Sequence, residues 1–179
     1  NGAPASSNVA QYAATVGIGF ADDTGLLLSL EHVHRRVFDT RWMARNKLQI
    51  GQNQSYWTGD LISHLQDDGY RNLFAGLAEK LLSDDETRYS WYARAGRTRD
   101  TLRIWRLIYA EYTRALLETS AGDNDSQALS GNYHWTWRDV DDLRTPTHGT
   151  VWSLQGGAGV TRGTVTSADT GQETEDSGP

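Results

Sequence analysis

The sequence contains no cysteine, one methionine and three prolines in 179 residues. Without cysteine, the chain can form neither a disulfide framework nor a thiolate metal site. No apolar run approaches the roughly 18 to 20 residues of a membrane-spanning helix, and no signal peptide is recognisable. We therefore expect a soluble protein that has no membrane partner, and the sequence leaves its compartment undefined.

The length and charge place further bounds on the chain. A chain of 179 residues suits one domain with its own hydrophobic core. The net charge of −6 argues against nucleic-acid binding through overall charge. Met43 is the only methionine and the chain begins at Asn1. This indicates a processed product, a recombinant product or a fragment of a longer polypeptide.

The segment from Ser83 to Ser120 has the spacing of one long helix. Residues 83–86, Ser-Asp-Asp-Glu, have the form of a capping box at a helix start. Gly96 would kink or break the helix, because glycine costs about 1 kcal/mol there. Eight residues recur at alternating steps of three and four, as on one helical stripe: Trp91, Ala95, Thr98, Leu102, Trp105, Tyr109, Tyr112 and Leu116. The sequence predicts a mainly α fold, a helical bundle around one long helix at about 84–119.

Four arginines would share the opposite side of that helix, within about 80° of one another: Arg99, Arg103, Arg106 and Arg114. Guanidinium groups bind phosphates and carboxylates in a bidentate manner, so this arginine stripe is a candidate surface for nucleic acid or an acidic partner. A solvated or salt-bridged helix face explains the same pattern more simply.

A second helix is predicted from residues 22–24, Asp-Asp-Thr, to about Leu48, and a third over 70–82. Glu31 and His34 are three residues apart in the second helix, the spacing used in di-iron bundles. The chain has no second Glu-x-x-His. An ordinary surface pair is therefore the simpler interpretation, and we expect no metal, no cofactor and no defined catalytic residue.

Three short segments show strand-like alternation and give a minor β component, at about 12–20, 132–137 and 151–154. Residues 1–8 are predicted to be a flexible N-terminal arm, and 9–154 a single mainly helical domain. Residues 155–179 form a low-complexity C-terminal arm with almost no large apolar side chain. Such a segment is disordered in isolation, so order in it would require another surface.

Three classes of function remain open. A structural or assembly protein, such as part of a viral capsid or another multi-subunit particle, fits the seven tryptophans and eight tyrosines, because these residues are favoured at protein interfaces. Its partners would be other chains of the assembly, and a virion its location. A helical metal-dependent enzyme would use Glu31/His34 or His134/His148, although no motif spacing supports either pair. A nucleic-acid-binding module would use the arginine stripe. We favour the first class and lean against an enzyme.

Overall fold

The protein forms one antiparallel β-sheet. The computed structural model describes residues 12–21, 25–37, 39–142, 147–167 and 173–178. These residues contain no helix, and therefore none that could span a membrane. The strands are β1 (Tyr12–Ala21), β2 (Gly25–Val37), β3 (Trp42–Gly51), β4 (Gln54–Ile62), β5 (Arg71–Leu82), β6 (Glu86–Asp100), β7 (Ile104–Thr119), β8 (Gly122–Val140), β9 (Gly149–Ser167) and β10 (Glu173–Gly178).

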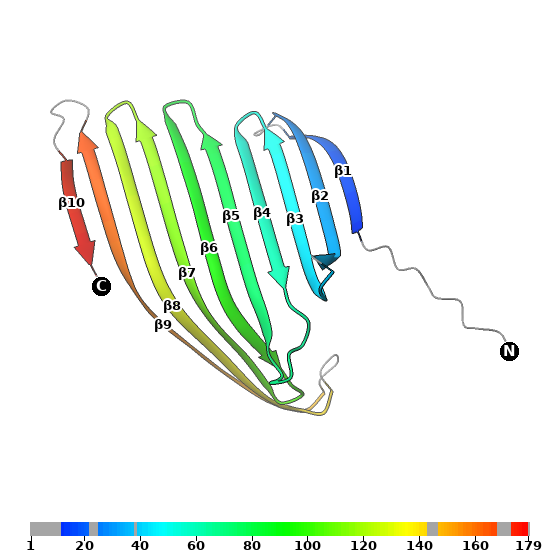
Figure 1. Cartoon of the computed structure of the whole chain (residues 1–179). Coiled ribbons are helices and arrows are strands. Elements are labelled where there is room, and N and C mark those ends of the chain that lie inside the picture. Colours follow the sequence, from blue (N-terminus) through cyan, green and yellow to red (C-terminus); the bar gives the residue numbers. More distant parts are fainter. Residues whose placement is uncertain (1–11, 22–24, 38, 143–146, 168–172, 179) are drawn as a thin grey trace.

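Each strand pairs with the next one in the sequence, in the order β1 to β10. Figure 1 shows the result, a single curved layer whose first and last strands lie at opposite edges. No described element covers either face of this layer. The strands run up and down in sequence order, so strands that are neighbours in the sequence are neighbours in the sheet.

The predicted long helix at 84–119 is wrong, because this segment forms the hairpin of β6 and β7. Its supposed capping box is the β5–β6 turn, where the Ser83 amide donates to the Glu86 carbonyl at 2.9 Å. The helical stripe combined residues from both faces: Trp105 and Tyr109 lie on one face of β7, and Tyr112 and Leu116 on the other. The mainly α helical bundle is therefore replaced by an all-β fold.

The other two predicted helices are also wrong: residues 25–37 and 42–48 belong to β2 and β3, and 71–82 form β5. The three strand-like segments are confirmed within longer strands, β1, β8 and β9. Residues 155–167 of the predicted C-terminal arm complete β9, which pairs with β8 of the same chain. The predicted N-terminal arm, 1–8, lies outside the described residues.

The sheet has two chemically different faces, because side chains alternate along a strand. Nineteen of the twenty-three exposed large hydrophobic residues lie on one face, here called the apolar face. Of the other four, Leu65 and Leu102 lie in turns. Val151 and Val165 lie on the opposite face, here called the polar face. The exposed large hydrophobic side chains are thus concentrated on one side of the sheet.

The described residues contain no hydrophobic core. None of their hydrophobic side chains is fully buried, and the only buried polar residue among them is Ser63, at 2% exposure. A single layer leaves both faces open, and burial against a second layer is what normally stabilises a sheet. Within the described residues, the apolar face is therefore left uncovered.

Candidate assembly surface

The apolar face is a continuous hydrophobic surface across the sheet. Phe20 is 75% exposed, Ile108 53% and Trp152 64%. Exposed apolar patches beyond a few hundred Å² mark interaction sites. Six of the seven tryptophans lie on this face and only Trp105 on the other; the six are Trp42, Trp57, Trp91, Trp135, Trp137 and Trp152. A surface so rich in tryptophan is suited to binding a partner.

Two polar rims border the apolar face near the strand ends. The Arg97 rim contains Asp68, Tyr70, Arg97, Arg99 and Arg106. The Arg114 rim contains Lys80, Arg114, Asp125, Arg162 and Glu175. Cations are thus present at both ends of the strands.

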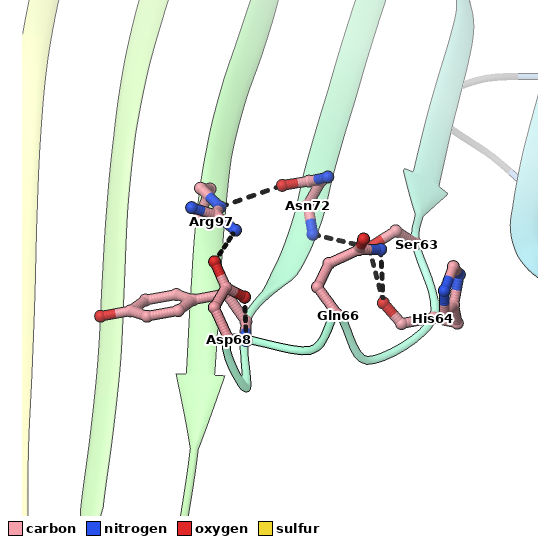
Figure 2. A network of polar contacts seen from close by, with 7 residues as sticks. Ser63, His64, Gln66, Asp68, Asn72 and Arg97 are labelled. Atoms are coloured by element: carbon pink, nitrogen blue, oxygen red, sulfur yellow. Dashed lines mark hydrogen bonds and ion pairs between the residues drawn. The ribbon is translucent and has the colours of Figure 1, made fainter.

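The Arg97 rim is fixed by the loop between β4 and β5 (Figure 2). The Arg97 guanidinium donates to Asp68 at 2.6 Å and to the Asn72 side chain at 3.1 Å, and it lies 4.9 Å from the Tyr70 ring centroid. The Tyr70 backbone N–H and Arg97 lower the pKa of Asp68, which stays ionised at neutral pH. The Ser63 hydroxyl oxygen completes the loop by accepting a hydrogen bond from the backbone N–H of Asn72 at 2.7 Å. The loop is therefore held to β6 by charged and polar contacts.

The Arg114 rim contains two cross-strand ion pairs. Arg114 donates to the Asp125 carboxylate through Nη2 at 2.5 Å and through Nε at 2.9 and 3.2 Å, and it lies 5.2 Å from the Trp91 ring centroid. The hydrogen bond from Arg114 lowers the pKa of Asp125, and the same bond raises the pKa of Arg114. Arg162 pairs with Glu175 at 2.9 Å across β9 and β10.

The polar face has its own network of charged groups. Arg94 and Glu111 form an ion pair at 2.5 Å, with side chains 30% and 21% exposed, and Arg94 lies 4.3 Å from the Tyr109 ring. Burial would lower the pKa of Arg94, but the hydrogen bond with Glu111 and its charge raise it overall. Lys47 pairs with Glu31 at 3.3 Å, and this hydrogen bond raises the pKa of Lys47.

A hollow of about 570 Å³ crosses β5 to β10, and most of its lining residues, such as Tyr92, Thr113 and Ala128, lie on the polar face. Its lining residues include one carboxylate, Asp176, and no histidine. This hollow lacks the paired acid and base that general acid–base catalysis requires.

Both edges of the sheet are open among the described residues. β1 pairs only with β2, and β10 covers only the 161–166 part of β9. Val16, Ile18 and Phe20 make β1 a long, apolar edge strand without charged residues. Such an edge is a template for pairing with another strand.

The predicted arginine stripe is dispersed by the strand geometry. Arg99 and Arg106 face each other across β6 and β7, whereas Arg103 lies in the turn between these strands. Arg114 is eight residues further along β7 and pairs with Asp125. The four arginines share one side only in a helix, where successive residues are rotated by about 100°. A role of these residues in binding nucleic acid stays a prediction.

The candidate metal pair is separated as well. Glu31 and His34 are three residues apart in β2, which places them on opposite faces of a strand. Glu31 pairs with Lys47, and the His34 ring lies 6.1 Å from that of His32 on the other face. Within the described ranges, no three His, Asp or Glu side chains are grouped as metal ligands.

The second pair, His134 and His148, does not converge either. His134 lies on the polar face of β8, with its ring centroid 5.8 Å from that of Tyr109, and its Nε2 atom is buried without a partner in the described structure. His148 lies beyond the far end of β8, where its amide donates to Asp141 at 3.1 Å. The Thr147 hydroxyl and the His148 amide hold the pKa of Asp141 at about 2. Asp141 thus stabilises a turn.

Comparisons with known proteins add no functional assignment. A scan against models of protein families found no family that matches this chain. A search of curated proteins found no protein of similar sequence.

Proposed function

We propose that the chain is a structural component of a larger assembly, in which its sheet forms part of a wall between other protein chains. The observation that carries this proposal is the absence of any buried hydrophobic side chain from the described sheet. A sheet of ten strands without a core of its own is stabilised only when its apolar face is covered and its edges are paired.

The open edges supply the protein contacts. Main-chain hydrogen bonds from β1 provide affinity for an added strand, and the alternating side chains provide specificity. The polar face contributes the hydrated side of the wall and carries the ion pairs Lys47–Glu31 and Arg94–Glu111. The virion location expected from the sequence stays a prediction.

Sedimentation velocity on the complete chain in detergent-free buffer tests this proposal. We expect species well above the monomer mass of 19.9 kDa, with the circular dichroism of β-structure. A monodisperse folded monomer would contradict the proposal.

A matched pair of variants separates the edge from the face. Ile18 in β1 and Leu28 in β2 are register partners on the same face, but only Ile18 lies at an edge. Lysine at an edge disfavours strand addition, so Ile18→Lys should reduce association more than Leu28→Lys. Equal effects would assign the association to the face alone.

A further inference from the structure

We infer that the apolar face contacts the hydrocarbon of a lipid bilayer, so that lipid is one partner of the wall proposed above. This inference deepens the proposed function and depends on it. The inference requires no membrane-spanning helix, because the proposed lipid-facing surface is one side of a β-sheet. It replaces the sequence-based expectation of no membrane partner, which considered only helical spans.

The distance between the two rims matches the thickness of a bilayer. On β7, Arg106 and Arg114 lie on the apolar face eight residues apart, with only Ile108, Ala110 and Tyr112 between them on that face. At about 3.4 Å per residue this interval is about 27 Å along the strand. On β5 the corresponding interval, from Asn72 to Lys80, is eight residues long. On β9 the interval from Thr150 to Arg162 is twelve residues long.

Strands that cross membranes are tilted by roughly 35–45°, which converts these intervals into apolar heights of about 19 to 33 Å. The outward apolar band of membrane-spanning sheets is about 25 Å tall, and the hydrocarbon layer about 30 Å thick. An interface with a protein partner has no reason to fall within this range of heights on three separate strands. The match therefore favours lipid over a protein as the occupant of this face.

The residues at the borders match the chemistry of lipid headgroups. Arg99 and Arg106 at one rim and Lys80 at the other present cations to anionic phosphates. Arg97, Arg114 and Arg162 are paired with carboxylates of the same rims. Trp137 and Trp152 are register partners on the apolar face, close to the Arg106 end of their strands. Tryptophan and tyrosine concentrate at such membrane interfaces. On the polar face, by contrast, charged groups such as Arg94 and Glu111 lie at mid-strand.

Neighbouring residues on opposite faces provide the test. Leu129 lies on the apolar face of β8, and Ser130 beside it lies on the polar face. Because the chain has no cysteine, Leu129→Cys and Ser130→Cys can each carry one nitroxide label. The labelled full-length chains are reconstituted with vesicles of phosphatidylcholine and phosphatidylglycerol, and collisions with oxygen and with a water-soluble nickel chelate are measured by electron paramagnetic resonance.

We expect the label at position 129 to collide mainly with oxygen and the label at 130 mainly with the nickel chelate. In parallel, Leu129→Arg should lower the vesicle partition coefficient by roughly 30-fold or more, while Ser130→Arg changes it by less than about 3-fold. Equal accessibility of the two labels, or no binding to vesicles, would overturn the inference.

The two proposals fail differently. A chain that associates in buffer but keeps both labels in water on vesicles overturns the lipid inference alone. A chain that is monomeric in buffer and inserts into vesicles overturns the protein-assembly proposal, while the assignment of the apolar face to lipid is supported.

Discussion

Replacing Gly96 by alanine should destabilise the protein, although the same change would stabilise a helix. Gly96 lies inside β6 directly opposite Tyr109 of β7. A Cβ atom added there would lie 2.4 Å from the Ile108 carbonyl oxygen and 2.5 Å from the Tyr109 Cβ. Backbone atoms cannot rotate away as a flexible side chain can, so the β6–β7 pair would have to separate locally. Overpacking of this kind costs about 1–3 kcal/mol.

If residues 84–119 were a helix, the change in stability caused by Gly96→Ala would have the opposite sign. Alanine is favoured over glycine in a helix interior by about 1 kcal/mol, so Gly96→Ala would increase stability if residues 84–119 were helical. The sign of the change in the free energy of unfolding therefore separates the two structures. Guanidinium unfolding followed by tryptophan fluorescence measures it, provided that the slope of the transition stays constant.

Gly131 supplies the matched control. It lies in β8 on the apolar face, and a Cβ atom added there would meet no other atom within 4 Å. Gly131→Ala should therefore leave stability unchanged or raise it by about 0.5–1 kcal/mol, because alanine loses less backbone entropy. If Gly96→Ala were as stable as the original protein, the β6–β7 pairing described here would be refuted.

Two further predictions concern charged groups. Glu111→Gln should lower the free energy of unfolding by about 1–3 kcal/mol, because the partly shielded Arg94 loses its ionised acceptor. A double-mutant cycle with Arg94→Gln measures the coupling energy of the pair. Additive effects of the two substitutions would show that the pair is not coupled. Asp141 should titrate at about 2. Since this pKa lies below the ordinary value of 3.8, the carboxylate stabilises its turn above about pH 4, and this contribution is lost as the pH falls through 2. Carbon-detected NMR should find the pKa moving toward 3.8 in Thr147→Val, and an unchanged value would contradict this origin.

The strands that the sequence revealed are those with one clean alternation. In 12–20, large residues such as Val16 and Ile18 alternate with small ones such as Gly17, and in 132–137 three aromatic residues alternate with polar ones. Such segments display period two even without knowledge of their partners. These predictions therefore needed no tertiary information.

The hairpin of β6 and β7 could not be recognised in the same way, because both of its faces carry large side chains. On β7, Trp105 and Tyr109 occupy the polar face, while Ile108 and Tyr112 occupy the apolar face. Selecting every third or fourth large residue then creates a helical stripe from two faces. Selecting every second residue along 104–119, as in a strand, would have placed on one face Ile104, Ile108, Ala110, Tyr112 and Leu116.

The candidate sites failed for the same geometric reason. Glu31 and His34 share a helix face but lie on opposite faces of a strand. Arg114 lies eight residues from Arg106 along the extended strand β7. The apolar face is a property of the whole sheet, since it depends on the register between nine pairs of strands. Residue spacing within one segment contains no such information.

The most direct test of a covered apolar face is a thiol-labelling scan of β7. Single cysteines at positions 107 to 112 of the assembled protein are treated with a water-soluble maleimide, and the rates are compared with those of the denatured chain. The sheet predicts slow labelling at 108, 110 and 112 and faster labelling at 107, 109 and 111. Rates that repeat every three to four residues, or equal rates on both faces, would contradict it.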